Sequence, residues 1–339
     1  MTTWTSKLGI MSACGIATLA VALTTPAWAQ APIIIKFSHV VANDTPKGKG
    51  AQKFKELAEK YTEGKVKVEL FPNSQLYKDK EELEALQLGA VQMLAPSLAK
   101  FGPLGAKEFE VFDLPFIFPD KASLRKITEG EIGKSMMRGL DARGVVGLAF
   151  WDNGFKIMTS NKQMKTPADL NGLKLRIQSS KVLESQMKAW GGVPQVMAFS
   201  EVYQALQTGV VDGTENTPSN VYTQKTHDVQ KHATATDHGY IGYAVISNKA
   251  FWDGLPADIR GQLEKAMAES TVYTNEIALK ENTDAIDAMK ASGKITFYTP
   301  TDAERKEWVA ASKAVHDEMA ARVGKDLLES IYKVTGASK

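Results

Sequence analysis

The 339-residue sequence has one cysteine, Cys14, which lies close to the N-terminus. A fold held together by disulfides is therefore excluded, as is a thiol nucleophile anywhere after residue 14. The charges nearly cancel, with 41 Lys and Arg against 39 Asp and Glu. They form no basic block of the kind that nucleic-acid-binding proteins carry, so nucleic acid is not an expected partner.

The sequence also lacks the motifs of catalysis and metal binding. Its five histidines include no HExxH pair, and their spacing places no set of metal ligands on one helix face. No G-x-S-x-G elbow is present, and Gly48-Lys49-Gly50 lacks the spacing of a phosphate-binding loop. We therefore predict no enzyme activity, no cofactor and no metal site.

The first thirty residues have the pattern of a targeting segment. Lys7 is the only charge before Lys36, and a run of apolar and small residues from 8 to 23 follows it. This run is shorter than the roughly 20 residues of a membrane span, and Ala27-Trp28-Ala29 is a small-residue cleavage pattern. We predict a signal peptide over residues 1–29, cleaved after Ala29, and export to the periplasm. An uncleaved membrane anchor is the alternative.

The remaining sequence alternates between strand and helix periodicities, which predicts an α/β fold. Strand patterns occupy residues 33–37, 65–71, 91–94, 145–150, 173–177, 194–197 and 210–213. Helix patterns occupy residues 46–61, 79–88, 182–190 and a segment that Ser200 is expected to cap. Residues 151–154, Trp-Asp-Asn-Gly, read as a turn. We find no internal repeat.

The C-terminal hundred residues are predicted to be mostly helical. From residue 257 to 291 there is no proline, and Gly261 is the only glycine. A helix of that length exceeds what one small lobe needs, so we expect it to bridge two lobes. A further helix over residues 301–322 opens with the capping box Thr301-x-x-Glu304.

Several sequence blocks resemble one family. They are residues 37–39 (Phe-Ser-His), 45–48 (Thr-Pro-Lys-Gly), 77–92 (with Leu-Gln-Leu-Gly at 86–89), 112–116 (Phe-Asp-Leu-Pro-Phe), 151–156, 173–177, 197–208 and 211–216. Together they resemble the extracytoplasmic solute-binding proteins of TRAP transporters, of the DctP type, and within that family the dicarboxylate-binding branch.

The resemblance implies a two-lobed periplasmic solute-binding fold, with a cleft between the lobes and a long helix spanning both. The implied first lobe comprises residues 31–153 plus about 242–281. The implied second lobe comprises residues 154–241 plus about 282–339.

The resemblance also implies binding residues on the second lobe. Arg176 matches the family arginine that binds the ligand carboxylate, and its planar fork of donors suits both carboxylate oxygens. Asn216 matches a ligand-binding asparagine, and Phe199 is expected to wall the pocket. Lys156 stands where sialic-acid-binding members carry a second arginine, which fits a smaller acid. Asn153, in the same block, is a further candidate.

A four-carbon dicarboxylate carries two charges, so the first lobe should supply a second cation. Lys47 is favoured because it lies at a helix N-terminus, where backbone N–H groups also attract anions. Lys49 and Lys100 are the alternative candidates for the second cation. However, Lys49 is expected to be solvated, and Lys100 is expected to hold another residue in place. His39 and Ser97 are weaker candidates for hydrogen bonds to a ligand hydroxyl.

We therefore expect a periplasmic protein that binds a small organic acid, with malate, succinate or fumarate favoured, and delivers it to TRAP membrane subunits. Binding of a keto acid or an aromatic acid is an alternative. So is a sensor component that presents its ligand to a receptor. An exported enzyme is disfavoured by the missing catalytic motifs.

Overall fold

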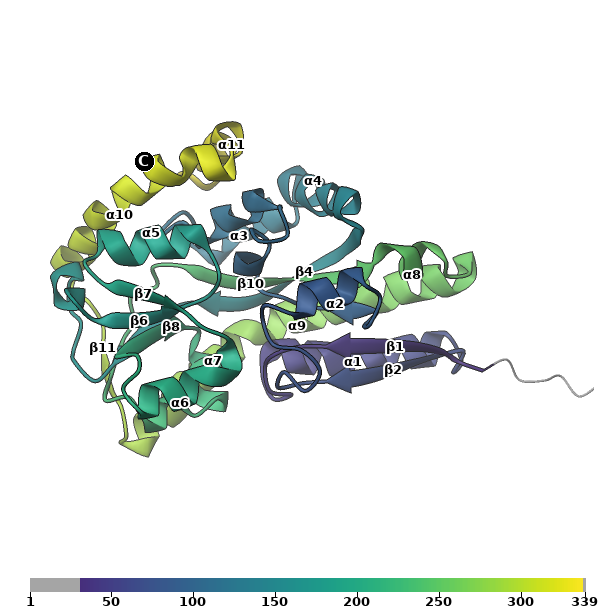
Figure 1. The fold of residues 1–339 in the computed structure, drawn as a ribbon, viewed down its shortest axis with the longest axis horizontal. Coiled ribbons are helices and arrows are strands. Elements are labelled where there is room, and N and C mark those ends of the chain that lie inside the picture. Colours follow the sequence, from purple (N-terminus) through teal and green to yellow (C-terminus); the bar gives the residue numbers. More distant parts are fainter. Residues whose placement is uncertain (1–30, 338–339) are drawn as a thin grey trace, which may run out of the picture. The chain divides into compact units, whose positions relative to one another are not determined.

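The structure is a computed structural model in which residues 31–337 are described, and they form two β-sheets with helices packed around them (Figure 1). The predicted cleavage site after Ala29 lies outside the described residues. The helices are α1 (Pro46–Tyr61), α2 (Glu82–Gln87), α3 (Lys121–Thr128), α4 (Glu131–Gly139), α5 (Lys181–Ala189), α6 (Val202–Gln207), α7 (Pro218–Thr223), α8 (Lys249–Asp253), α9 (Ala257–Ser292), α10 (Asp302–Val323) and α11 (Lys325–Thr335).

The first sheet has the strand order β2-β1-β3-β10-β4. Its strands are β1 (Ile33–Ser38), β2 (Val66–Phe71), β3 (Met93–Leu94), β4 (Val145–Phe155) and β10 (Tyr240–Asn248). Strand β1 runs parallel to β2 and β3, whereas β10 is antiparallel to β3 and β4. The predicted alternation in β2 is confirmed, since Val66 and Val68 are buried and Lys67 between them is exposed. Their side chains share a core with α1 and α9.

The second sheet has the strand order β11-β9-β5-β8-β6-β7. Its strands are β5 (Ile157–Ser160), β6 (Lys174–Ile177), β7 (Val193–Val196), β8 (Gly213–Asn216), β9 (His232–Thr234) and β11 (Thr296–Tyr298). Parallel pairing of β6 with β7 and β8 aligns the carboxyl ends of these strands. We refer to the parts built around the first and second sheets as the first and second lobes.

The turn predicted at residues 151–154 is wrong. Strand β4 continues through this segment because its backbone pairs with β10, with Trp151 opposite Tyr243 and Gly154 opposite Ile241. This tertiary pairing outweighs the local preference for a turn. Glycine is needed at position 154, because a Cβ there would lie 2.9 Å from the side-chain nitrogen of Asn282 on α9.

Other predicted boundaries shift as well, and the strand expected at residues 210–213 is β8, which begins only at Gly213. Ser200 does not cap a helix: it lies within a short 3₁₀ turn, Phe199–Glu201, that leads directly into α6. Helix α2 begins at Glu82, three residues later than the apolar pattern indicated. The predicted capping box at Thr301 and Glu304 is confirmed at the start of α10.

Helix α9 is the predicted long helix, with 36 residues, and it contacts elements of both lobes. It packs against α1 and β4 on the first lobe and against α7 on the second (Figure 1). Within residues 31–337, neither this helix nor any other is long and apolar enough to cross a membrane.

The predicted lobe boundaries near 153 and 242 fall inside β4 and β10, and the boundary near 281 falls inside α9. The end of the chain, assigned to the second lobe, packs through α11 against α3. Leu328 and Ile331 of α11 belong to the core that also contains Leu124 and Ile127 of α3.

A short repeat relates the two lobes, contrary to the expectation of none. Residues 85–91 read Ala-Leu-Gln-x-Gly-x-Val, and so do residues 205–211. Each copy forms the end of a helix, α2 or α6, and the turn that leads to a buried strand, β3 or β8. Gly89 and Gly209 have positive φ values, 76° and 73°, which only glycine adopts freely. The two lobes therefore present equivalent segments to the space between them.

Candidate functional site

A buried cavity lies where the two lobes meet, and it is lined by side chains from both. Its lining residues are Val40, Val41, Lys47, Asp79, Ser97, Lys100, Arg176, Gln178, Phe199, Asn216, Asn220, Ile241 and Tyr243. The space between the walls is about 290 Å³, and the lining residues are buried apart from Asp79, whose side chain is 10% exposed. The cleft is therefore closed. Six of the ten residues predicted from the sequence line it: Lys47, Ser97, Lys100, Arg176, Phe199 and Asn216.

Arg176 reaches the cavity from β6 and is almost completely buried, with 1% of its surface exposed. As the alternation predicted, Leu175 and Ile177 pack into the core on the other face of the strand. The Nε and Nη2 atoms of Arg176 donate to the carbonyl oxygen of Met197, at 3.1 and 2.9 Å. Within residues 31–337 Arg176 forms no ion pair. Its Nη1 edge is thus left to bind a carboxylate.

Asn216 stands at the end of β8, beside Arg176 in the cavity wall. Its Oδ1 accepts hydrogen bonds from the backbone N–H of Thr217, at 2.9 Å, and from Asn220 Nδ2, also at 2.9 Å. These bonds fix the orientation of the amide and direct its nitrogen, a donor, away from them. Phe199 packs its ring 5.8 Å from the guanidinium carbon of Arg176.

Lys47 supplies a second buried cation from the first lobe. Thr45 caps α1 by accepting from the Gly48 N–H, and Lys47 lies in the first turn behind it. Its Nζ donates to the Ala95 carbonyl oxygen at 2.9 Å and stands 4.0 Å above the centre of the Tyr243 ring. Burial, together with repulsion from the nearby Lys100, lowers the pKa of Lys47 to about 7. In the described part of the chain it forms no ion pair.

Lys100 lines the same cavity, but carboxylates of its own lobe neutralise it. Its Nζ bonds to Asp79 and, at 2.8 Å, to Glu82. Burial opposes the charge, yet these two carboxylates raise the pKa of Lys100 to about 12. Burial would also raise the pKa of Asp79, but Lys100 and then Arg176 lower it to about 2. Lys100 is therefore charged and already paired.

Polar contacts cross the cleft and hold the lobes together. Asp79 Oδ2 accepts a hydrogen bond from the backbone N–H of Phe199 at 2.6 Å. Ser97 Oγ bonds to Gln178 Oε1 within the cavity wall. Near these contacts, the half-exposed side chains of Lys78 and Glu201 form an ion pair at 2.9 Å. Asp79 and Phe199 occupy equivalent places before α2 and α6 in the two repeats, so the repeat structure itself builds this side of the cavity.

Four predicted residues lie outside the cavity wall: Lys156, Asn153, Lys49 and His39. Lys49 pairs with Glu281 of α9 at 2.6 Å, and a third of its side chain is exposed. His39 is buried, and neither ring nitrogen has a hydrogen-bond partner among residues 31–337. Burial, and then the nearby Lys47, lowers the pKa of His39 to about 3. Their roles in binding stay predictions.

Lys156 belongs to a buried ionic cluster in the second lobe. Its Nζ lies 2.9 Å from Glu215 Oε1, and His238 Nε2 lies 2.8 Å from Glu215 Oε2. Burial would raise the pKa of Glu215, but Lys156 and His238 lower it to about 2. Alternation along β8 places Glu215 on the opposite face from Asn216, which explains why its lysine partner does not line the cavity.

Asp79, Gln178, Asn220 and Tyr243 are polar lining residues that the sequence analysis missed. Gln178 is two residues after Arg176 and shares its strand face, so the period-2 alternation contained this signal. Tyr243 lies on β10, whose residues are all buried and so show no alternation.

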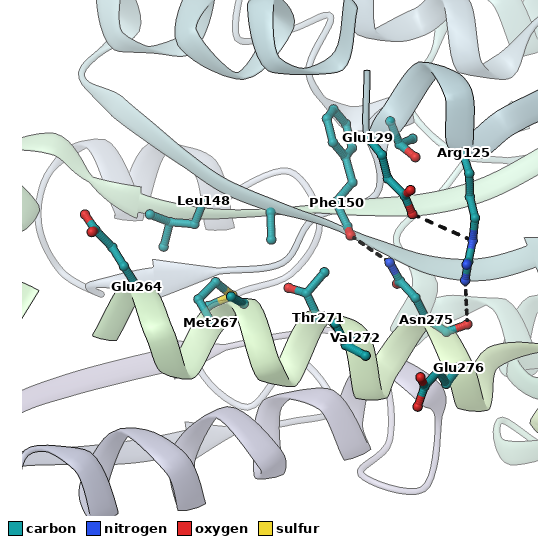
Figure 2. Close-up of a pocket in the computed structure, with 13 residues that line it drawn as sticks. Arg125, Glu129, Leu148, Phe150, Glu264, Met267, Thr271, Val272, Asn275 and Glu276 are labelled. Carbon is teal, nitrogen blue, oxygen red and sulfur yellow. Dashed lines mark hydrogen bonds and ion pairs between the residues drawn. The ribbon is translucent and has the colours of Figure 1, made fainter. Parts of the chain in front are cut away.

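A larger hollow, with about 480 Å³ open to water, lies between α3, β4 and α9 (Figure 2). Its floor is formed by apolar residues such as Leu148 and Met267. Arg125, the one cation that residues 31–337 contribute to this hollow, already donates to the Asn275 carbonyl oxygen at 3.3 Å and lies 3.9 Å from Glu129. Figure 2 marks both contacts with dashed lines. This hollow therefore lacks an available cation for an organic acid, and the buried cavity remains the candidate site.

Two lobes joined by two long strands and a helix, around a buried cavity with cations on both sides, define a two-lobed solute-binding protein. Residues 37–323 match the family model described as bacterial extracellular solute-binding protein, family 7, or DctP. The chain therefore belongs to the DctP family of TRAP solute-binding proteins, as the sequence blocks indicated. This is a family of binding proteins, so the prediction of a non-enzymatic protein is confirmed.

Individual relatives cover nearly the whole chain. The C4-dicarboxylate-binding periplasmic protein DctP of Rhodobacter capsulatus is 66% identical over 95% of this chain and 96% of its own length. A TRAP solute-binding protein from Shewanella oneidensis with bound succinate is 43% identical, covers 90% of this chain and 100% of its own, and has a TM-score of 0.88. A TRAP solute-binding protein from Pseudomonas aeruginosa with bound L-malate is 42% identical. The match covers 85% of this chain and 100% of the other, with a TM-score of 0.82.

Proposed function

We propose that the protein captures a four-carbon dicarboxylate in the cavity between its lobes and delivers it to the membrane subunits of a TRAP transporter. One observation carries the ligand assignment: Arg176 and Lys47 are buried cations, one on each lobe, and neither has an ion-pair partner within residues 31–337. A buried unpaired charge is costly, so each cation favours an anionic ligand group. A four-carbon acid with a carboxylate at each end satisfies both.

The two cations have different parts in this proposal. Arg176 binds one carboxylate through its free Nη1 edge, with Asn216 adding an amide donor. Lys47 binds the other carboxylate, and its position above the Tyr243 ring holds the ammonium group at the cavity. Lys100 has a structural role, because it already forms ion pairs with Asp79 and Glu82. Asn153 and Lys156 then support the site from outside the cavity rather than touching the ligand.

Ligand entry requires the lobes to separate. Almost all the residues that line the closed cavity are buried, and contacts such as the hydrogen bond from the Phe199 N–H to Asp79 Oδ2 cross from one lobe to the other. We propose a hinge in β4, β10 and α9, at the predicted boundaries near residues 153, 242 and 281. A ligand that bridges Arg176 and Lys47 stabilises the closed state because it contacts both lobes at once.

Relatives with this architecture support the biological setting. The Rhodobacter capsulatus relative is named a C4-dicarboxylate-binding periplasmic protein, and two similar structures hold succinate and L-malate. We accordingly place the mature protein in the periplasm, after cleavage behind Ala29, with a TRAP membrane carrier as its partner. A keto acid or an aromatic acid with a single carboxylate leaves Lys47 unpaired and is disfavoured.

Calorimetric titration with succinate tests the assignment. Hydrogen bonds to charged groups contribute roughly 1.5–3 kcal/mol each, and truncation also leaves a carboxylate buried without its counterpart. We therefore expect Arg176→Ala and Lys47→Met each to weaken succinate binding by about a hundredfold or more. Lys53→Met, which removes an exposed lysine from the same helix as Lys47, is the matched control and should bind normally. Near-wild-type affinity in Arg176→Ala or Lys47→Met would contradict the assignment.

A further inference from the structure

Tyr243 occupies an unusual place in the cavity wall. It lies on β10, is only 2% exposed, and its ring supports the Lys47 ammonium group at 4.0 Å. Its hydroxyl lies at the junction of the lobes, bonded to Asn153 of β4 and to Asn220 of α7. Neither the composition of β10 nor the family blocks drew attention to this residue.

The hydrogen-bond partners of the Tyr243 hydroxyl are both donors. Asn153 Nδ2 lies 2.7 Å from the hydroxyl oxygen, in the orientation that lets Asn153 Oδ1 accept from Ser219 Oγ at 2.9 Å. Asn220 Nδ2 lies 3.4 Å from the same oxygen and also donates to Asn216 Oδ1. A tyrosine hydroxyl accepts two hydrogen bonds and donates one. Both acceptor positions are filled, and the hydrogen is left without a protein acceptor among the described residues.

The remaining neighbour, Lys47, is a donor as well, so this part of the cavity presents hydrogens from several sides. Burial raises the pKa of Tyr243, so the hydroxyl keeps its proton at neutral pH. An ionised carboxylate, with two oxygens and several lone pairs, matches this surrounding.

We infer that the Tyr243 hydroxyl donates a hydrogen bond to the ligand carboxylate that Lys47 binds, and that it thereby helps to select acids with two carboxylates. This inference rests on the proposed function. Because Asn220 belongs to the second lobe and Tyr243 to the first, the same hydroxyl joins the ligand to a contact between the lobes. Tyr243 is thus a specificity-determining residue for the second carboxylate.

The test compares succinate with butyrate, which has the same carbon chain but one carboxylate. Dissociation constants are measured for wild type, Tyr243→Phe and Tyr240→Phe. The phenylalanine at 243 keeps the ring beneath Lys47 and removes only the hydroxyl. Tyr240 is the matched control, since it lies on the same strand and buries a hydroxyl, bonded at 2.7 Å to Asp152, outside the cavity wall.

We expect Tyr243→Phe to weaken succinate binding at least about tenfold and butyrate binding far less, so the preference for succinate falls by about that factor. Tyr240→Phe should leave the preference unchanged. Equal weakening of both acids in Tyr243→Phe would assign Tyr243 a merely structural role and overturn the inference, as would unchanged succinate binding. If the wild-type protein itself did not prefer succinate to butyrate, the proposed function would fail, and the inference with it.

Discussion

Raising the pH from 7 to 9 should weaken succinate binding because Lys47 must carry a proton to hold the second carboxylate. In the closed structure, burial and the neighbouring Lys100 lower the pKa of Lys47 to about 7. A bound carboxylate stabilises the ammonium form, so the pKa of Lys47 is higher in the complex than in the free protein. The ligand therefore prefers the protonated protein, and binding draws one proton from solution wherever Lys47 is neutral beforehand.

The sign and size follow from these pKa values. Below pH 7 Lys47 is already protonated, and this group adds no pH dependence. Above pH 7 each pH unit costs about 1.4 kcal/mol, which raises the dissociation constant about tenfold until the pKa of the complex is reached. Between pH 7 and 9 the dissociation constant therefore rises about fiftyfold, because about half of Lys47 is already neutral at pH 7.

Other titratable groups near the cavity are distinguishable from Lys47. The pKa of Lys100 is about 12 and that of His39 about 3, so neither titrates between pH 7 and 9. Asp113 is buried outside the cavity wall, and burial raises its pKa to about 7 despite the opposing charge of Lys156. Asp113→Asn removes that titration and serves as the control.

Calorimetry in two buffers of different ionisation enthalpy counts the protons taken up on binding. We expect nearly one proton for succinate at pH 8 and almost none for butyrate. Lys47→Arg, which stays charged at every pH in this range, should bind with no uptake and a flat profile. A dissociation constant that is constant from pH 7 to 9 in the wild type, or the same slope in Lys47→Arg, would refute the reasoning.

Two further predictions concern the fold and the maturation of the chain. Lys100→Met leaves Asp79 and Glu82 buried without their cation. We therefore expect the free energy of unfolding, measured in urea, to fall by about 3–5 kcal/mol. A loss under about 1 kcal/mol would contradict the structural role of Lys100. Protein isolated from the periplasm should begin at Gln30, and N-terminal sequencing that still finds the residues before it would contradict cleavage after Ala29.

The sequence predicted elements well where periodicity reflects a half-buried surface. Strand β6 alternates because Leu175 and Ile177 face the core while Arg176 faces the cavity, and this one pattern placed the main candidate residue correctly. The prediction failed where pairing with a distant strand determines the local structure. Residues 151–154 have the composition of a turn, but in the fold they pair with β10.

The choice among the cations of the first lobe needed the structure. Lys47 and Lys100 look alike in the sequence. Only folding brings Asp79 and Glu82 into ion pairs with Lys100, while Lys47 has no ion-pair partner in the part of the chain that the structure describes. Tyr243 was missed for a related reason. A strand buried on both faces carries no alternation, and the position of its hydroxyl depends on asparagines that are distant in the sequence.

A crystal structure of the protein with succinate tests the central claim most directly. We predict one carboxylate on the free edge of the Arg176 guanidinium and the other within about 3 Å of Lys47 Nζ, as charge-assisted hydrogen bonds require. Succinate bound in the hollow between α3, β4 and α9, or with its second carboxylate on Lys156 rather than Lys47, would contradict the account.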